Sequence, residues 1–150
     1  MKPIKELKIA LASDHAGYNL NQVVMEYLTK EGATLKDFGC YSTESCDYPD
    51  FAHPAAAAVE SGEFDFGITI CSTGNGICMT ANKHQGIRAA LCWEHRLAEL
   101  ARQHNNANIL GMPANFISVE TALDIVKTFF STDFEGGRHE RRINKIPLAK

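Results

Sequence analysis

A cysteine, two hydroxyl side chains and two glycines lie together in the stretch Cys71-Ser72-Thr73-Gly74-Asn75-Gly76, directly after an apolar run typical of a buried strand. The glycines permit backbone conformations and close approaches that larger side chains would block. A helix that starts there directs free N–H groups toward whatever lies above it, and such a position suits an anion. A helix N-terminus also favours the thiolate of a neighbouring cysteine. The stretch therefore predicts that Cys71 is a base or nucleophile beside an anion-binding set of amides.

A structural interpretation of the same stretch stays open from spacing alone. Cys71 could be a small buried residue that ends a strand, and Gly74-Asn75-Gly76 could be a plain turn. The stretch has neither the third glycine of a dinucleotide-binding fingerprint nor the Gly-Lys-Ser/Thr ending of a P-loop. Nucleotide binding by either device is not expected.

Side chains at three other places could serve the same reaction. Asp14 and His15 directly follow the first expected strand, where both could face one cleft, or could act as a helix N-cap and a solvated histidine. His104 lies at a helix end, where a cation can simply complement the helix dipole. Arg138 and Arg142 are spaced i, i+4 at the start of the last expected helix. These two guanidinium groups could bind a phosphate, or could form a solvated charged face.

The cysteines and histidines lack the spacing of metal ligands. Cys71 and Cys78 are seven residues apart, the histidines are scattered, and neither HExxH nor paired CxxC motifs occur. We therefore expect no metal site and no metal cofactor. The five cysteines are an odd number without CxxC pairing, so free thiols are expected rather than disulfides.

The elements that must position these residues follow from short apolar runs that alternate with longer helical patterns. Strands are expected at Leu7 to Ala12, Ala33 to Asp37, Phe66 to Ile70, Arg88 to Cys92 and Asn108 to Gly111. Helices are expected at Tyr18 to Lys30, Phe51 to Ser61, Gly76 to Lys83, Trp93 to Gln103 and Val119 to Phe130, with a last helix from about Arg138. Gly32 is expected at a helix C-cap, and Pro54 in the first turn of the second helix.

The alternation of strands and helices predicts one α/β domain over residues 1–150. Its strands are apolar throughout, as in strands buried on both faces. The expected architecture is a doubly wound, Rossmann-like domain with about five parallel strands and helices on both faces. In such folds the site lies beyond the carboxyl ends of the strands.

Composition excludes several classes of protein. The chain has 150 residues, of which 45% are hydrophobic and 22% charged, and its formal charge is −3, as in an ordinary globular protein. No excess of positive charge favours nucleic acid, no run approaches the ~18 apolar residues of a membrane span, and no signal-peptide pattern opens the chain. We expect a cytoplasmic protein without a nucleic-acid or membrane partner.

Several motifs together resemble the ribose-5-phosphate isomerase B family, which is grouped with the two galactose-6-phosphate isomerase subunits. The motifs span essentially the whole chain: Asp14-His15, Asp47-Tyr48-Pro49, Cys71 to Gly76, Ala81-Asn82-Lys83, Gly86-Ile87-Arg88, Gln103-His104-Asn105 and Glu135 to His139. The resemblance implies an aldose-ketose isomerase that interconverts ribose 5-phosphate and ribulose 5-phosphate, a step of the pentose phosphate pathway, without metal or cofactor. It also implies a homodimer or tetramer with the active site between subunits.

The resemblance assigns catalytic roles. Cys71 is similar to the family's catalytic cysteine and would move a proton between C2 and C1 through an enediolate. The N–H groups of residues 72 to 76 would stabilise the oxyanion, and Thr73 would assist proton movement between the O1 and O2 hydroxyls. His104 of a neighbouring subunit would open the furanose ring, with Asp14 assisting.

The resemblance also implies three sets of residues that bind the substrate. The phosphate would be held by His15, Arg138 and Arg142, and the sugar would be bound or enclosed by Tyr48 and Asn105. The amide-bearing residues that would contact the substrate are Ser72, Gly74, Asn75 and Gly76.

Two departures from the family pattern bear on the substrate. Ser72 stands where most relatives have glycine, and Asn115 stands where many relatives have a phosphate-binding arginine. The alternatives are an isomerase for another sugar, such as allose or galactose 6-phosphate or an unphosphorylated sugar, and a non-catalytic sugar-phosphate-binding protein. The match at 103 to 105 argues against the galactose-6-phosphate subunits, and the presence of both Cys71 and His104 argues against a non-catalytic protein.

Overall fold

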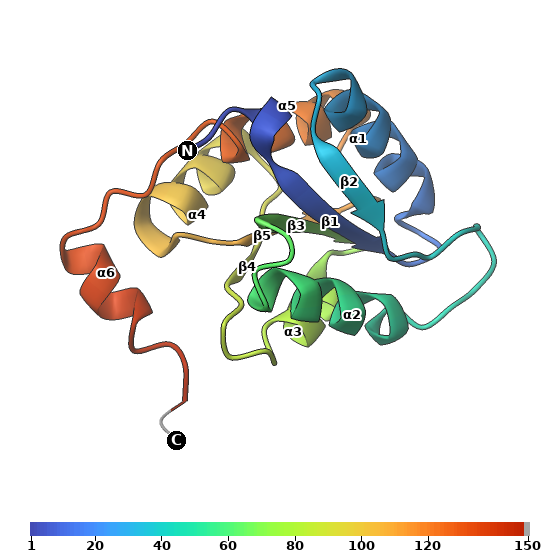
Figure 1. Cartoon of the computed structure of the whole chain (residues 1–150). Coiled ribbons are helices and arrows are strands. Elements are labelled where there is room, and N and C mark those ends of the chain that lie inside the picture. The colour runs from blue at the N-terminus through green and yellow to red at the C-terminus, as the bar shows by residue number, and fades with distance from the viewer. Residues whose placement is uncertain (149–150) are drawn as a thin grey trace.

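A five-stranded parallel sheet forms the centre of the computed structural model, which describes residues 1–148 (Figure 1). The strands are β1 (Lys8–Ser13), β2 (Thr34–Asp37), β3 (Phe66–Cys71), β4 (Ala89–Leu91) and β5 (Ile109–Pro113). Their order across the sheet is β2-β1-β3-β5-β4. The doubly wound α/β class predicted from the sequence is confirmed. Residues 149 and 150 of the predicted domain lie outside the described residues.

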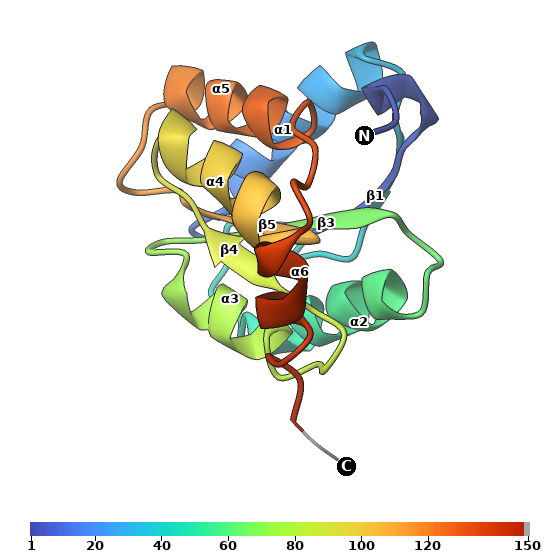
Figure 2. The same cartoon turned by 90° about the vertical axis from the view of Figure 1, so that its left-hand side faces the viewer.

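Helices cover both faces of the sheet, and Figure 2 shows the three layers. The helices are α1 (Tyr18–Lys30), α2 (Pro49–Glu60), α3 (Asn75–Ala81), α4 (His95–Asn105), α5 (Val119–Phe129) and α6 (Arg138–Ile143), and a short 3-10 helix spans Ile4–Glu6. The apolar faces of α1, α4 and α5 pack on one face of the sheet, and those of α2 and α3 pack on the other.

Side chains of β1 show why the strands are apolar throughout. Ile9 and Leu11 point into the core beneath α1, α4 and α5, whereas Ala10 and Ala12 point into the core beneath α2. All four side chains are fully buried, because successive residues of a strand face opposite sides of the sheet and both sides are covered. The small alanines allow the alanine-rich α2 to approach the sheet closely.

The predicted elements all occur, with end shifts of one or two residues. The prediction for Pro54 was wrong, because α2 begins at Pro49 and Pro54 lies inside the helix. The exposed side of α2 carries Pro54, so the hydrogen bond that its ring removes is lost on the solvent face. Gly32 takes a left-handed φ of 91° just after α1, as expected for a glycine that ends a helix.

The order of the strands creates a switch point between β1 and β3. From β1 the chain moves outward to β2, then returns to β3 on the other side of β1, continues to β4 at the far edge, and ends with β5 between β3 and β4. Ser13 at the end of β1 pairs with Ile70 near the end of β3. We call the edge formed by the carboxyl ends of the strands the carboxyl edge, and the opposite one the amino edge. Ligand sites of doubly wound sheets lie at the carboxyl edge beside this switch point.

The C-terminal segment projects from the rest of the molecule. Figures 1 and 2 show α6 at the end of α4, with the chain continuing away from the body. His139 and Ile143 are the buried residues of α6, and they anchor it. Among residues 1–148, no helix is long and apolar enough to cross a membrane.

Candidate active site

Asp14 directly follows β1, and Cys71 is the last residue of the neighbouring strand β3, so both lie at the switch point. The N–H of Asp14 donates to the carbonyl of Ile70 at 3.2 Å, and the N–H of Gly17 donates to Asp14 Oδ1 at 2.9 Å. Only glycine fits at position 17, because an added Cβ would lie 2.3 Å from the carbonyl oxygen of Ile70. The glycine therefore lets the loop after β1 fold against the end of β3. This holds Asp14 at the carboxyl edge, against the end of β3.

Cys71 ends β3 on the side of the sheet that faces α2 and α3. Its neighbours in the core are Ala52 of α2 and Ile77 of α3, and the residue is 5% exposed. A thiol in this position is shielded from bulk water and directly precedes the loop at the start of α3. The two interpretations drawn from the sequence are therefore compatible, since Cys71 is both a buried strand end and a side chain at the site.

The loop between β3 and α3 presents a set of backbone amides. Gly74 has a left-handed φ of 76°, and an added Cβ would lie 2.2 Å from Leu91 Cδ1. The N–H of Asn75 donates to Thr73 Oγ1 at 3.2 Å, so this amide is already satisfied. The N–H groups of Ser72, Thr73, Gly74 and Gly76 have no acceptor among residues 1–148. These free donors follow the Cys71 thiol directly and can bind an oxyanion.

Tyr48 closes one side of this loop. Its ring lies over Gly76, where an added Cβ would be 2.5 Å from Tyr48 Cζ. A pocket of about 520 Å³ opens beside it, lined by Asp14, His15 and residues 46 to 50. His15 Nδ1 accepts from the N–H of Cys46 at 3.3 Å, which fixes the imidazole at the pocket wall. Asp14, His15, Tyr48 and the amide loop therefore share the carboxyl edge.

The two departures from the family pattern form a hydrogen-bonded pair. Asn115 Nδ2 donates to Ser72 Oγ at 2.7 Å, and the N–H of Asn115 donates to the Ser72 carbonyl at 3.1 Å. Ser72 follows β3 and Asn115 follows β5, which are paired strands. The amide of Asn115 therefore supports the Cys71 loop.

His104 and Asn105 lie at the opposite edge of the sheet. The helix α4 starts after the carboxyl end of β4 and ends before the amino end of β5, so its last residues lie at the amino edge. Ile109 pairs with Gly67 at the start of β3, whereas Pro113 pairs with Cys71. The rise of about 3.3 Å per residue along a strand separates the two ends of β3 by more than 15 Å. The structure does not bring His104 to Cys71 within one chain.

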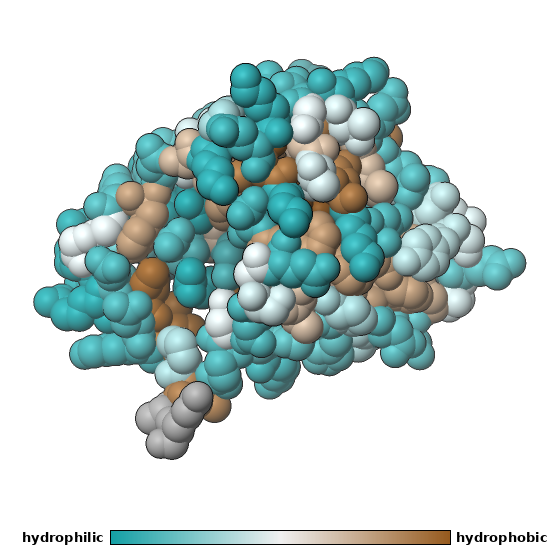
Figure 3. Space-filling model, viewed as in Figure 1, coloured by the Kyte–Doolittle hydropathy of each residue, from teal (hydrophilic) through white to brown (hydrophobic). Residues whose placement is uncertain are grey.

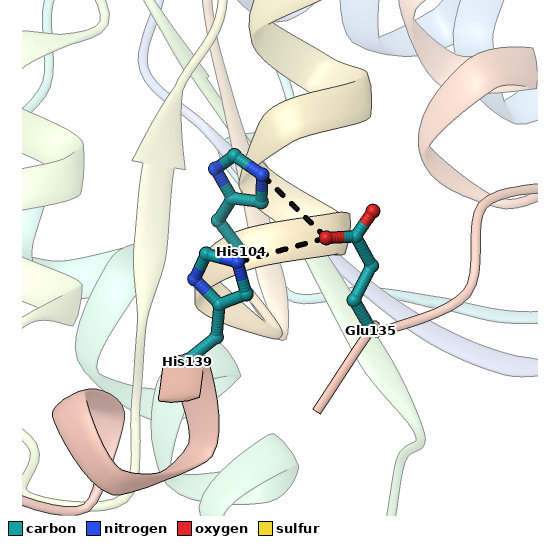
Figure 4. A group of neighbouring side chains, drawn as sticks. All are labelled: His104, Glu135 and His139. Atoms are coloured by element: carbon teal, nitrogen blue, oxygen red, sulfur yellow. Dashed lines mark ion pairs between the residues drawn. The ribbon is translucent and has the colours of Figure 1, made fainter. Parts of the chain in front are cut away.

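His104 belongs to a cluster that sequence reasoning did not identify as functional. The rings of His104 and His139 stack with centroids 4.1 Å apart and planes inclined by 10°. Glu135 Oε1 lies 3.7 Å from His104 Nε2 and 3.6 Å from His139 Nε2 (Figure 4). Burial, followed by the positive charges of His104 and Arg138, lowers the pKa of His139 below that of a free histidine. The four-residue spacing of Glu135 and His139 was the available signal in the sequence.

Arg138 and Arg142 point to solvent from α6, close to this cluster. Both are exposed, whereas His139 and Ile143 face the body of the protein. Among residues 1–148 neither guanidinium has a carboxylate partner within ion-pair distance. They are therefore free to bind an anion, but they lie with His104 and not with Cys71 and His15.

Known proteins are similar to this chain over nearly its whole length. The family model described as Ribose/Galactose Isomerase matches residues 9–146. Ribose-5-phosphate isomerase B of Escherichia coli is 42% identical over 139 residues, which cover 93% of this chain and 93% of that protein. The probable ribose-5-phosphate isomerase B of Mycoplasma genitalium is 44% identical over 140 residues, which cover 92% of each chain.

Solved structures agree with these relatives. The crystal structure of a ribose 5-phosphate isomerase B from Thermotoga maritima is 53% identical with a TM-score of 0.93, covering 95% of this chain and 98% of that one. Ribose-5-phosphate isomerase B from Mycoplasma genitalium with bound ribulose 5-phosphate is 43% identical with a TM-score of 0.90, covering 94% of each chain. The resemblance drawn from the motifs is confirmed.

Proposed function

The chain belongs to the ribose/galactose isomerase family and is a sugar-phosphate isomerase, and we propose that it interconverts ribose 5-phosphate and ribulose 5-phosphate with Cys71 as the base. The observation that carries the proposal is the Cys71 side chain at the switch point, directly before four amides that have no acceptor in the described chain. A base and an oxyanion-binding group are what an enediolate mechanism requires.

The reaction moves one proton between adjacent carbons. In the open-chain aldose, the Cys71 thiolate removes the proton from C2, and the electron pair of that bond forms the enediolate as charge develops on O1. The amides of the loop stabilise this charge, and each well-placed donor contributes about 3 kcal/mol. Thr73 assists the transfer of a proton from O2 to O1. The Cys71 thiol then returns its proton to C1, which gives the ketose and regenerates the thiolate.

A second copy of the chain would complete the site. Cys71, Asp14 and His15 lie at the carboxyl edge, whereas His104, Arg138 and Arg142 lie at the amino edge or on α6 beside it. A two-fold dimer that places the carboxyl edge of each chain against α6 of the other would assemble two complete sites. In this arrangement the partner's His104 opens the sugar ring, with Asp14 assisting, and Asn105 of the same segment helps to enclose the sugar.

Apolar side chains on both surfaces support this dimer. At the carboxyl edge Trp93 and Phe116 are 52% and 71% exposed and line one pocket with Thr73. On the C-terminal segment Ile146 and Leu148 are also exposed. Figure 3 shows hydrophobic surface around this projecting segment. Exposed apolar surface of this kind marks protein interaction sites, and a second copy would cover it on both sides.

The phosphate would lie between Arg138 and Arg142 from one chain and His15 from the other. These two guanidinium groups, on successive turns of one helix and without a carboxylate partner in the part of the chain that the structure describes, can bind its oxygens with charge-assisted hydrogen bonds. Tyr48, above the amide loop, would cover the sugar.

The Ser72 and Asn115 pair favours one alternative, an isomerase for another sugar. The side-chain amide of Asn115 donates to Ser72 and carries no charge. A phosphate bound in this site would therefore have one cationic partner fewer than in many relatives. A 6-phosphohexose or an unphosphorylated sugar would depend less on that partner.

An assay against a panel of aldose and ketose phosphates and neutral sugars tests the proposal. We expect the highest kcat/KM for ribose 5-phosphate or ribulose 5-phosphate. Cys71→Ala should lower kcat by at least the 10²- to 10⁴-fold typical of a lost general base. Cys92→Ala removes another buried thiol and serves as the matched control. A neutral sugar with the highest kcat/KM, or full activity in Cys71→Ala, would overturn the proposal.

A further inference from the structure

Three potential metal ligands from two separate segments converge beside α6. They are His104 at the end of α4, Glu135 in the segment before α6, and His139 in the first turn of α6, and their ligand atoms lie within 4.8 Å of one another. The N–H of Glu135 donates to the carbonyl of Gln103 at 3.0 Å, which fixes the segment against α4. Figure 4 shows the Nε2 atoms of both rings joined by ion pairs to the same carboxylate oxygen of Glu135.

The distances in this cluster are too long for hydrogen bonds and close to those between ligands of one metal ion. Glu135 Oε1 lies 3.7 Å and 3.6 Å from the two Nε2 atoms, beyond the 2.7–3.2 Å range of N–H···O bonds. Two ligands of a tetrahedral Zn²⁺, each at about 2.0–2.1 Å, lie about 3.3–3.4 Å apart. An ion would be bound once each ring turns out of the stack, because the Nε2 lone pair lies in the plane of the ring and must point at the ion.

His139 supplies a second and independent observation. Its side chain is 9% exposed, and Nε2 is buried without a hydrogen-bond partner among residues 1–148. A buried ring nitrogen without a partner is costly in a folded protein, and a bound cation would satisfy it. The Glu135 side chain is half exposed, so an ion from solvent can reach the carboxylate first and then bind the two imidazoles.

We propose that His104, Glu135 and His139 form a binding site for a divalent transition-metal ion such as Zn²⁺, and that the bound ion inhibits the isomerase. Two imidazoles and one carboxylate are a ligand set that Zn²⁺ accepts, with water in the fourth position. The inhibitory part rests on the function proposed above, because it requires His104 to open the sugar ring. Metal binding itself does not depend on that function.

Inhibition follows from the lone pairs of the imidazole. When Nε2 of His104 binds the ion and Nδ1 carries hydrogen, the ring has no lone pair left to accept a proton. The ring then cannot act as a base on the sugar hydroxyl in the partner's site. The ion is thus an inhibitor and not a cofactor, and removing it with EDTA should leave activity intact or raise it.

Calorimetric titration with Zn²⁺ tests the site without relying on activity. The full-length, EDTA-treated Cys71→Ala protein removes the thiol of the candidate active site as a competing ligand, and we expect one Zn²⁺ per chain. In that background Glu135→Gln and His139→Asn should each weaken binding at least tenfold, because a ligand is lost. Glu140→Gln changes an exposed carboxylate of α6 outside the cluster and should bind like the parent. Unchanged affinity in Glu135→Gln, whose exposed side chain makes misfolding no explanation, would overturn the site.

Assays of the metal-free protein with all five cysteines separate the two halves of the proposal. Zn²⁺ should lower the rate of ribose 5-phosphate isomerisation, EDTA should restore it, and Glu135→Gln should need at least tenfold more Zn²⁺ for the same inhibition. Equal inhibition of both proteins would contradict inhibition through this cluster. If the metal-free protein isomerises no sugar phosphate, the proposed function and the inhibitory role both fail, and the calorimetric result still decides the metal site.

Discussion

The position of a residue at the end of a strand distinguishes the candidate catalytic cysteine from the other buried cysteines. Cys71, Cys78 and Cys92 are all buried free thiols, yet only Cys71 lies at the end of β3, directly before amides that have no acceptor in residues 1–148. The sequence identified Cys71 because glycines and hydroxyl groups follow it within a few residues. Glu135 and His139 entered only as part of a family motif and without a role, because their role depends on the stacking of His139 with His104, more than thirty residues away. Local spacing reveals only groups that are close in sequence.

The cysteines should differ sharply toward an alkylating reagent. Burial raises the pKa of Cys78 and of Cys92 to about 12. At pH 8 a thiol with that pKa is ionised in about one molecule in ten thousand, and the protonated thiol reacts poorly. We expect iodoacetamide to inactivate the folded protein by modifying Cys71, with Cys78 and Cys92 intact by mass spectrometry and with ribulose 5-phosphate protecting. Inactivation that follows modification of Cys78 or Cys92 would contradict the assignment.

The arginines of α6 should determine affinity for the phosphate. A charged hydrogen bond contributes about 1.5–3 kcal/mol, so Arg138→Ala should raise KM for ribose 5-phosphate roughly 10- to 150-fold. Asn115→Arg should lower that KM or leave it unchanged, because it adds a cation near the Cys71 loop. The matched control is Arg141→Ala, which removes an exposed arginine of the same helix outside the i, i+4 pair. Steady-state kinetics with a phosphorylated sugar and a neutral one would refute this role if Arg138→Ala weakened both equally.

The helices and strands were largely predictable from the sequence, and the residues at which they begin and end were less so. The period of apolar residues gave α1 its bounds, because Gly32 marks its end and the pattern inside it is regular. The prediction placed Pro54 in the first turn of the second helix, because proline favours the first turn. In the structure α2 starts at Pro49, which satisfies the same preference. Pro49 and Pro54 are five residues apart, so they cannot both lie in the first turn of one helix. Propensity alone could not decide which of them starts the helix.

The loop before α3 should depend on glycine at position 74. Gly74→Ala combines a left-handed φ of 76° with a clash against Leu91, so we expect destabilisation beyond the 1–3 kcal/mol typical of backbone strain and a lower kcat as the amides shift. Gly62→Ala is the matched control, because φ is 84° but an added Cβ would meet no atom within 4 Å. Urea unfolding compares the two variants. Equal loss of stability in both would show that the contact with Leu91 is unimportant.

At the scale of the whole molecule, the sequence predicted a doubly wound sheet but not its strand order. That order depends on long-range pairing, such as β3 beside β5, which no local pattern encodes. It is the order and direction of the elements that separate Cys71 from His104, Arg138 and Arg142. The motifs placed all of these residues in one reaction, at a site expected between subunits, and the structure shows that one chain does not bring them together. The proposed dimer would bring them together.

Mixing two inactive variants tests the shared site most directly. Cys71→Ala and His104→Ala should each be inactive alone. After subunit exchange, each mixed dimer has one site with Cys71 from one chain and His104 from the other. Random pairing of equal amounts makes half the dimers mixed, so about one quarter of the normal sites are restored.

A second mixture, in which no chain has an intact His104, is the control for this experiment. Replacing the Cys71→Ala protein by the double variant Cys71→Ala/His104→Ala supplies no intact His104 and should restore nothing. Native mass spectrometry verifies exchange in both mixtures. The shared site predicts that about one quarter of the activity of the unmodified protein returns in the first mixture only. Verified exchange without any return of activity would contradict the account.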